Sequence, residues 1–410
     1  MYSLTRRRFL TAAAGGALAA FNALAAPERG RAKITDIKVM VLQGPRTYTL
    51  VKVLTDAGVF GIGEAYGSPG VGVKEGILDM RPYFIGKDPL EIEALYVGLP
   101  ARTDGSAHML LRAASGIEAA LWDLAGKLLN VPVHTLLGGK YRDRVRVYHD
   151  EGPHNLLDKS SCQDWAARMK SDPAGWTAFK FGPPRSNPRA DAARDRSNRL
   201  LTSRELREIR QGFEMCRDAI GWDYDLIVHC HWEYDLRTAI QLADAVEPIK
   251  PLWLEDPLPP DFSESWVRLA AASKVPIGTG ENLARRHGFK DFILNQGCDI
   301  VQLDIRNTGG LLESKKIADL ADLYYLPMAA HDTGSIVCNL ATVHWAAAVR
   351  DFVAAETLIG RRNWMDDVIL HEGPIVQEGH ITVPDKPGLG IELNRDVVKA
   401  NLAKGEKYWD

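Results

Sequence analysis

The chain carries Leu226-Ile227-Val228-His229 and, 26 residues further on, Leu252-Trp253-Leu254-Glu255. Each is a short apolar run that ends in a residue able to bind a metal or transfer a proton. Such runs recur along the chain, with polar residues 26, 26, 23, 27 and 25 positions apart. A strand, a crossover helix and two short loops need about this length. The six polar residues are His229, Glu255, Glu281, Asp304, His331 and Glu356.

This repeat predicts an α/β fold in which parallel strands close into a barrel. Right-handed crossovers between consecutive parallel strands bring the carboxyl ends of the strands to one mouth. A doubly wound open sheet also alternates strands and helices, but it would not place titratable residues so regularly at strand ends. We therefore expect a modified (β/α)8, TIM-like barrel over residues 146–372, with the six polar side chains converging at its mouth.

A smaller α+β capping domain is predicted over residues 26–145. Segments 33–39, 49–53 and 59–63 have the composition of antiparallel strands, and Asp56-Ala57-Gly58 supplies a turn before the third. Residues 373–410 follow the barrel, and we expect this C-terminal segment to return to the capping domain.

One helix of the capping domain is predicted over residues 115–129. Its apolar residues recur at intervals of 4, 3 and 4, which places them on one helix face. Ser115 and Glu118 have the spacing of a capping box at its start. The apolar residues are Ile117, Leu121, Leu124 and Leu128.

Residues 1–25 are predicted to be a twin-arginine signal peptide. Thr5-Arg6-Arg7-Arg8-Phe9-Leu10 precedes an uncharged stretch from Thr11 to Leu24, and Ala23-Leu24-Ala25 suits signal-peptidase cleavage. A disordered N-terminus or a short membrane anchor is the alternative, although the stretch is shorter than the roughly 20 residues of a spanning helix. We expect a periplasmic protein, exported folded and free of the membrane in its mature form.

Charge and cysteine content exclude several partner classes. Loss of the three arginines of the signal leaves 47 basic against 53 acidic residues, a formal charge of −6. No Lys/Arg block follows the signal, so we expect no nucleic-acid partner. The five cysteines are scattered without a CxxC pair, which favours neither a disulfide framework nor a zinc ribbon.

The two glutamates at the ends of adjacent strands predict a bound cation. Glu255 and Glu281 would repel each other in a shared mouth unless a cation neutralised them. A divalent hard metal with oxygen ligands is the simplest solution. The alternative is that both residues are helix N-caps or surface acids at strand–helix junctions.

Several motifs together resemble the mandelate racemase/muconate lactonizing enzyme branch of the enolase superfamily. The resemblance extends over most of residues 33–395, and the order and spacing of the motifs carry it. His231, two residues beyond the first ligand position, is similar to the pattern of galactonate- and mannonate-type sugar acid dehydratases. The motifs are Trp253-Leu254-Glu255-Asp256-Pro257, Gly278-Thr279-Gly280-Glu281-Asn282, Gln302-Leu303-Asp304, Thr308-Gly309-Gly310, Ala329-Ala330-His331, Ile117–Asp123 and Pro387–Gly390.

This resemblance implies removal of the α-proton of a small sugar acid, an enediolate, and loss of water. His331 is then the base, and Asp304 fixes its tautomer and stabilises the imidazolium. His231 protonates the departing hydroxyl from across the mouth. Glu356, if protonated, donates a hydrogen bond to the substrate carboxylate. Lys180 complements the charge of the substrate. Each of these residues also has a structural alternative, as a hydrogen-bonded or solvated side chain.

His229 departs from the family pattern, which has an acidic residue at the first metal-ligand position. The resemblance implies Mg²⁺, but an imidazole suits Mn²⁺ or Fe²⁺ better. We expect His229, Glu255 and Glu281 to hold the metal. The alternatives are ligation by Asp225, Glu233 or Asp235 in place of His229, or weak binding or none.

The resemblance also leaves alternatives for the reaction. The second lysine of the two-base racemases is absent, because Gly182 follows Lys180-Phe181. A cycloisomerase or epimerase is the enzymatic alternative to the dehydratase, and a non-catalytic sugar acid-binding protein is the other. Family resemblance implies a homo-oligomer. Substrate specificity is expected from loops at Gln43–Tyr48, Gly67–Val73, Thr103–His108 and Gly182–Leu200, the last with Arg185 and Arg189.

Overall fold

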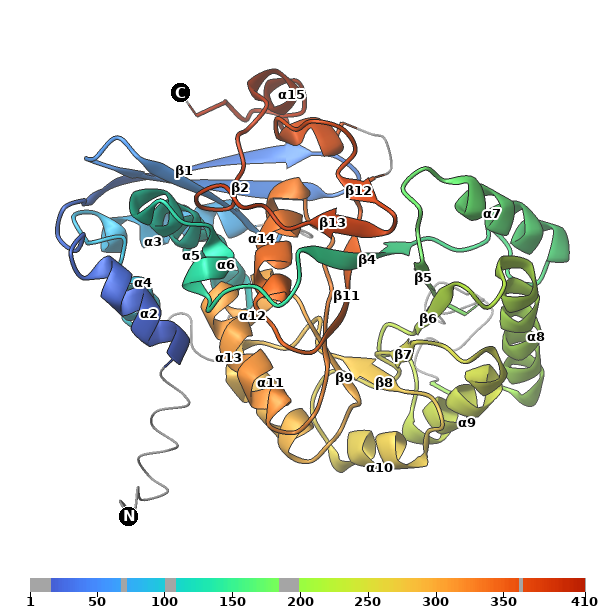
Figure 1. The fold of residues 1–410 in the computed structure, drawn as a ribbon. Coiled ribbons are helices and arrows are strands. Elements are labelled where there is room, and N and C mark those ends of the chain that lie inside the picture. The colour runs from blue at the N-terminus through green and yellow to red at the C-terminus, as the bar shows by residue number, and fades with distance from the viewer. Residues whose placement is uncertain (1–15, 68–71, 100–107, 184–198, 361–363, 410) are drawn as a thin grey trace, which may run out of the picture.

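The structure is a computed structural model that describes residues 16–67, 72–99, 108–183, 199–360 and 364–409. Its larger part is a closed barrel of eight parallel strands (Figure 1). The strands pair in chain order, and β11 pairs with β4 to close the sheet. The predicted (β/α) barrel is therefore confirmed. The strands are β4 (Arg144–Asp150), β5 (Ala178–Phe181), β6 (Asp225–His229), β7 (Trp253–Glu255), β8 (Ile277–Thr279), β9 (Ile300–Leu303), β10 (Met328–Ala330) and β11 (Phe352–Thr357).

Helices connect the strands and cover the outside of the barrel (Figure 1). Each crossover between consecutive strands contains at least one α-helix, as parallel pairing requires. The helices are α7 (Lys159–Ser171), α8 (Ser203–Ile220), α9 (Leu236–Val246), α10 (Glu264–Ala272), α11 (Arg285–Leu294), α12 (Ile305–Thr308), α13 (Leu311–Asp322) and α14 (Ile336–Ala347), with short 3₁₀ turns at η2 (Glu247–Ile249) and η3 (Asp366–Val368).

The interior of the barrel is a packed core. Seven strands each contribute one buried residue to a single cluster. The Tyr148 hydroxyl accepts a hydrogen bond from Gln302 Nε2 at 2.9 Å and donates one to the Ala330 carbonyl oxygen at 3.2 Å. This layer fixes the strands that present the polar residues. The cluster consists of Tyr148, Ala178, Ile227, Trp253, Ile300, Ala329 and Ala354.

The N-terminal domain has an antiparallel sheet covered by helices, as predicted. Strand order is β1 (Ile34–Gln43), β2 (Thr47–Thr55), β3 (Phe60–Ala65). Helix α5 (His108–Leu129) lies so close to β3 that a Cβ on Gly61 would come 2.0 Å from the Ala120 carbonyl oxygen. The remaining helices are α3 (Val73–Phe84), α4 (Ile92–Val97) and α6 (Val133–Leu136).

The predicted capping box at Ser115 and Glu118 is wrong, because α5 already begins at His108. Ser115 lies inside the helix, and its hydroxyl donates to the Leu111 carbonyl oxygen. Glu118 instead crosses to the barrel domain, where its carboxylate accepts hydrogen bonds from the backbone N–H groups of Leu311 and Leu312 at 2.8 and 3.0 Å. It therefore caps α13 and joins the two domains.

The C-terminal segment contacts both parts of the molecule. Strands β12 (Val376–Gln377) and β13 (His380–Thr382) extend the sheet next to β4. Beyond α15 (Arg395–Ala400), the chain pairs with β1 of the capping domain through backbone hydrogen bonds from Gln43 to Asn401 and from Ala403 to Val41.

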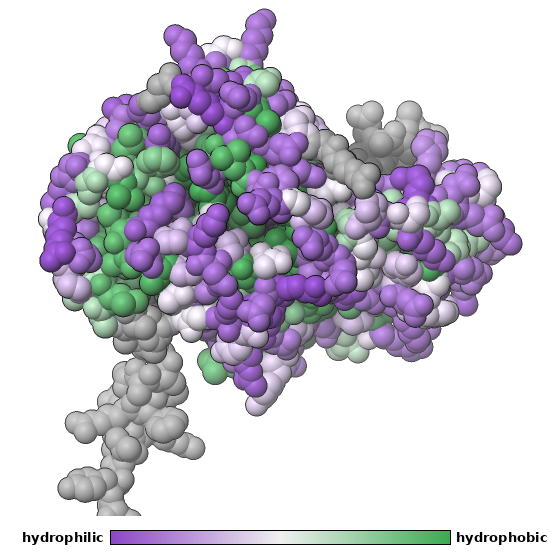
Figure 2. Space-filling view, turned by 45° about the horizontal axis from the view of Figure 1, so that its top comes forward, coloured by the Kyte–Doolittle hydropathy of each residue, from purple (hydrophilic) through white to green (hydrophobic). Residues whose placement is uncertain are grey.

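At the other end, helix α2 (Gly16–Ala25) precedes the capping domain, and the Phe21 ring lies 5.4 Å from the Trp122 ring between centroids. The predicted twin-arginine motif, residues 5–10, lies outside the described residues. Within the described part of the chain, no helix combines the length and apolar character needed to cross a bilayer. The space-filling view shows hydrophobic residues gathered on the left, over the capping domain (Figure 2).

Candidate active site

The structure brings the predicted polar residues together at the carboxyl ends of the barrel strands. His229 and Glu255 end β6 and β7, and Glu281 lies two residues after β8. Asp304 and His331 follow β9 and β10 directly. All are buried. Lys180 within β5 and Glu356 within β11 complete the set.

Four of the buried side chains at the mouth form a group that could hold a metal ion. His229, Glu255, Asp256 and Glu281 each offer one ligand atom, and these atoms all lie within 4.8 Å of one another. Asp225 and Asp235, two alternatives to His229, have other roles. Asp225 pairs with Arg146 at 2.7 Å, and Asp235 accepts from the Thr238 backbone N–H as N-cap of α9.

The sequence did not indicate Asp256, and there is a physical reason. Adjacent residues of a strand point to opposite faces, so Glu255 and Asp256 should not both reach the mouth. The following residue, Pro257, also favours an extended backbone at position 256. Asp256 instead adopts a left-handed backbone with a φ of 48°, which breaks the alternation.

Three buried atoms of this group have no hydrogen-bond partner among the described residues. They are Nε2 of His229, Oδ2 of Asp256 and Oε2 of Glu281. Buried polar atoms are nearly always paired, and a cluster without partners marks a place for an additional group. One ring nitrogen and carboxylate oxygens are suitable ligands for a divalent cation. The residues present therefore fit a divalent metal ion.

The charges in this group are unbalanced without a cation. Burial, with the neighbouring Glu255 and Glu356 charges, raises the pKa of Glu281 to about 7 despite opposing effects of His331 and Lys180. Burial also raises the pKa of Asp256 well above its usual value, as do Glu281 and Glu255. Burial and the positive charge of Lys180 lower the pKa of His229 well below 6.5, so its imidazole is neutral. A neutral imidazole is the form that binds metals.

Lys180 connects the metal-ligand group to Glu356. Its Nζ lies 2.9 Å from Glu255 Oε1 and 3.0 Å from Glu356 Oε2. Burial raises the pKa of Glu356, but Lys180 and His331 together lower it by more, and the net pKa is below the usual value. The role of a protonated Glu356 as a hydrogen-bond donor stays a prediction, although the contact with Lys180, which the sequence did not reveal, favours the ionised carboxylate.

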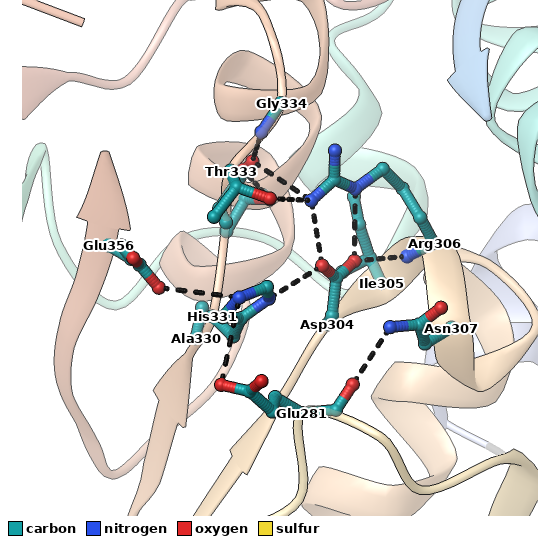
Figure 3. A network of polar contacts seen from close by, with 12 residues as sticks. Glu281, Asp304, Ile305, Arg306, Asn307, Ala330, His331, Thr333, Gly334 and Glu356 are labelled. Atoms are coloured by element: carbon teal, nitrogen blue, oxygen red, sulfur yellow. Dashed lines mark hydrogen bonds and ion pairs between the residues drawn. The ribbon is translucent and has the colours of Figure 1, made fainter. Parts of the chain in front are cut away.

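The second part of the site is the His331–Asp304 pair (Figure 3). His331 Nδ1 lies 2.8 Å from Asp304 Oδ2, and its Nε2 lies 3.6 Å from Glu281 Oε2 and 3.7 Å from Glu356 Oε2. Burial lowers the pKa of His331, but Glu281, Glu356 and Asp304 raise it well above 6.5 in total. The arrangement can hold a proton on His331 and fix the ring through Asp304.

Arg306 holds Asp304 from the other side, and the sequence did not indicate it. Its Nε donates to Asp304 Oδ1 at 3.1 Å, its Nη2 to Oδ2 at 2.7 Å, and its backbone N–H to Oδ1 at 2.8 Å. Burial raises the pKa of Asp304, but Arg306 and His331 lower it well below the usual range. Glu64, from β3 of the capping domain, lies 3.5 Å from Arg306 Nη1. No local sequence signal could show a contact between two domains.

His231 lies beside His229 on a turn after β6. The two rings stack with centroids 3.6 Å apart, and His231 has a φ of 52° and an exposed side chain. In the closed sheet β6 is four strands from β10, which places His231 on the opposite side of the barrel from His331. Arg185, Arg189 and most of the predicted loops at 67–73, 103–108 and 182–200 lie outside the described residues.

Comparison with known proteins identifies the family of both domains. Residues 36–138 match the mandelate racemase / muconate lactonizing enzyme N-terminal domain, and residues 162–397 match the enolase C-terminal domain-like family. A solved mandelate racemase/muconate lactonizing enzyme-like protein from Rubrobacter xylanophilus has a TM-score of 0.85 and 32% identity, covering 92% of this chain and 99% of that one.

Curated relatives are similar over nearly their whole length. A D-xylonate dehydratase of Haloferax volcanii is 37% identical over 92% of this chain and 91% of its own. A D-mannonate dehydratase of a Sphingomonas species is 30% identical over 92% of this chain and 95% of its own. A D-galactonate dehydratase of Xanthomonas campestris is 30% identical over 86% of this chain and 90% of its own. The chain thus belongs to the enolase superfamily, in its mandelate racemase/muconate lactonizing enzyme branch.

Proposed function

We propose that the protein is a divalent-metal-dependent dehydratase of a sugar acid of the aldonate type. The observation that carries the proposal is the position of the His331–Asp304 pair next to a buried group in which three ligand atoms have no hydrogen-bond partner among the described residues. A base beside a cation site is the arrangement needed to remove a proton from the carbon next to a carboxylate. The relatives named as sugar acid dehydratases support the same reaction class.

The metal would be held by His229, Glu255 and Glu281. When bound, it would bind the substrate carboxylate and stabilise the negative charge that develops on it. The imidazole of His229 favours Mn²⁺ or Fe²⁺ over the Mg²⁺ that is typical of the family. Without a carboxylate at position 229, this ligand set is also less negative and repels an anionic substrate less.

The proton at C2 goes to His331 Nε2, because Nδ1 is committed to Asp304 Oδ2 at 2.8 Å. Asp304 keeps the ring in the required tautomer and stabilises the imidazolium that forms. Arg306 keeps Asp304 ionised and in place. A cation on Glu281 would remove a negative charge that now raises the pKa of His331, which favours the neutral base.

The other groups act on the carboxylate and the leaving group. Glu356 lies 3.7 Å from His331 Nε2, and Lys180, which contacts both Glu356 and Glu255, supplies positive charge for the anionic substrate. His231, on the opposite side of the barrel, protonates the C3 hydroxyl as it departs. Because the acid and the base lie on opposite sides of the mouth, one residue can remove the C2 proton while a different residue protonates the C3 hydroxyl.

The test is product analysis with purified, metal-supplied enzyme. D-Xylonate is the first substrate to try, followed by D-mannonate and D-galactonate. We expect a 2-keto-3-deoxy acid, detected as its semicarbazone, from at least one acid. An isomer of unchanged mass would instead indicate an epimerase or cycloisomerase. Lack of solvent-deuterium exchange at C2 in every acid of a broad library would indicate a binding protein.

We also propose that the protein is exported through residues 1–25 and assembles as a homo-oligomer. The motif Thr5–Leu10 supports export, and the apolar surface over the capping domain in Figure 2 supports self-association. Cell fractionation of the wild type and of an Arg6→Lys, Arg7→Lys variant tests export, since the variant should stay in the cytoplasm. Light scattering coupled to size exclusion tests the assembly.

A further inference from the structure

The expected metal ligands alone leave the centre short of negative charge and of free ligand atoms. A neutral His229 with two glutamates supplies two negative charges, whereas three carboxylates supply three. In addition, each oxygen of Glu255 already accepts one hydrogen bond, which leaves fewer lone pairs for a metal. Oε1 accepts from Lys180 Nζ at 2.9 Å, and Oε2 accepts from Trp253 Nε1 at 2.8 Å. A further anionic ligand would correct both shortages.

Asp256 has the properties of that ligand. It is fully buried, and one of its carboxylate oxygens, Oδ1, accepts from the Thr279 hydroxyl at 2.6 Å. The other, Oδ2, has no hydrogen-bond partner among the described residues. One buried carboxylate is thus fixed by the next strand and leaves a single oxygen free.

The backbone at Asp256 is built to present this side chain. Its N–H donates to the Gly278 carbonyl oxygen at 3.0 Å, and its carbonyl oxygen accepts from the Trp232 N–H at 2.6 Å. Between these two contacts the residue has a φ of 48°, a conformation that costs a non-glycine residue free energy. Strain of this kind is kept where the surrounding structure uses it.

We infer that Asp256 is a ligand of the divalent cation, together with His229, Glu255 and Glu281, and that it supplies the negative charge that a histidine at position 229 lacks. The four ligand atoms lie within 4.8 Å of one another. The inference rests on the metal requirement of the proposed function and not on the identity of the substrate. It predicts a centre of one imidazole and three carboxylates.

The test is Mn²⁺ binding to the full-length, metal-free protein, measured by calorimetry and elemental analysis without any substrate. Asp256→Asn keeps an oxygen that can accept from Thr279 but removes the charge. We expect one Mn²⁺ per wild-type chain and an affinity about 100-fold lower in Asp256→Asn. Asp299→Asn is the matched control, because Asp299 accepts from the Ile277 N–H just before β9, at the opposite end of the strands, and should leave binding unchanged.

A double-mutant cycle tests the compensation between positions 229 and 256. In His229→Asp, which restores a carboxylate, the loss caused by Asp256→Asn should shrink to about 10-fold or less. Equal losses in both backgrounds would overturn the compensation. Wild-type Mn²⁺ affinity in Asp256→Asn, or a wild type that binds no Mn²⁺, would overturn the ligand assignment.

Two further readouts separate the inference from folding and from the proposed reaction. The circular dichroism of metal-free Asp256→Asn should match the wild type and its melting temperature should be no lower, while the rise in melting temperature on adding Mn²⁺ should be lost. If Asp256→Asn loses Mn²⁺ and no sugar acid is dehydrated by the wild type, the ligand assignment stands and the dehydratase proposal fails.

Discussion

The two sides of the barrel mouth differ in how their buried polar atoms are satisfied. On the β9–β10 side, Asp304 holds His331 and is itself held by Arg306, so the protein alone fixes the geometry. On the β6–β8 side, His229, Asp256 and Glu281 each keep a buried atom without a hydrogen-bond partner among the described residues. The first side is fixed by the protein's own contacts, and the second offers buried ligand atoms that could hold a cation.

This difference has an energetic consequence. A buried polar group without a partner costs about 1–3 kcal/mol of stability, and a charged one costs more. The metal-ligand side therefore destabilises the metal-free fold, and metal binding offsets that cost. The His331–Asp304 side carries no such cost, and its residues should respond differently to mutation.

The largest expected effect is that of His331→Asn, which removes the base but leaves the ligand group intact. Turnover of the sugar acid should fall by about 10³-fold, because general-base catalysis is lost. Mn²⁺ affinity should stay within about threefold of the wild type, because no ligand is removed. Steady-state kinetics and calorimetry on the same preparation check both. Loss of Mn²⁺ binding in this variant would show that the two sides are not separate.

Glu281→Gln should disrupt the metal-ligand group on the β6–β8 side. Turnover should fall by about 10²-fold because the metal is lost. The metal-free variant should nevertheless melt about 2 °C higher than the metal-free wild type at pH 8. The reason is that burial raises the pKa of Glu281 to about 7, so the wild-type carboxylate is ionised and buried at that pH. Differential scanning calorimetry measures the shift. A lower melting temperature would mean that Glu281 stabilises the fold without metal.

Arg306→Lys should reduce turnover by about 10-fold and leave Mn²⁺ binding unchanged. A lysine keeps the positive charge but cannot donate to both oxygens of Asp304, so the carboxylate and His331 lose their fixed orientation. Arg286→Lys is the control, because Arg286 pairs with Glu313, which is not one of the proposed site residues. Equal turnover in the wild type and Arg306→Lys would assign the arginine a structural role only.

Glu118→Gln has the smallest expected effect on turnover, and it acts instead on stability through the contact between the domains. Burial raises the pKa of Glu118 from 4.5 to about 7, although backbone N–H groups oppose this. The free energy of unfolding should therefore fall as pH rises from 4.5 to 7, because the unfolded chain releases this proton first. The contribution is about 3 kcal/mol.

Urea unfolding at several pH values measures the free energy of unfolding. Between pH 4.5 and 7 this free energy should fall less steeply in Glu118→Gln than in the wild type. Burial also raises the pKa of Glu64 to about 7, so the free energy of unfolding of Glu118→Gln should still fall somewhat with pH. Glu214→Gln is the control, because Glu214 forms an exposed ion pair with Arg210. Its free energy of unfolding should depend on pH as in the wild type. A slope unchanged by Glu118→Gln would contradict the assignment.

The sequence was sufficient for the barrel and for much of the mouth. Apolar runs that end in polar residues at regular spacing predicted that Glu255, Glu281, Asp304 and His331 would meet, since parallel strands end at one face. The antiparallel sheet of the capping domain was also predicted, because its strands are local and joined by recognisable turns.

What the sequence did not reveal depends on contacts between distant parts of the chain. The left-handed backbone of Asp256 has no local signature and runs against the preference set by Pro257. The contact that favours an ionised Glu356 comes from Lys180, which lies 176 positions away. Glu118 has the spacing of a local cap, but it caps a helix of the other domain. Periodicity reports on faces and spacing and carries no information about such partners.

The most direct test of the central claim is hydrogen–deuterium exchange at C2 of a sugar acid in D₂O, followed by proton NMR. The claim predicts exchange or turnover with Mn²⁺ supplied, none after chelation of the metal, and none in His331→Asn with Mn²⁺ still bound. Exchange that continues without metal, or that survives in His331→Asn, would contradict it.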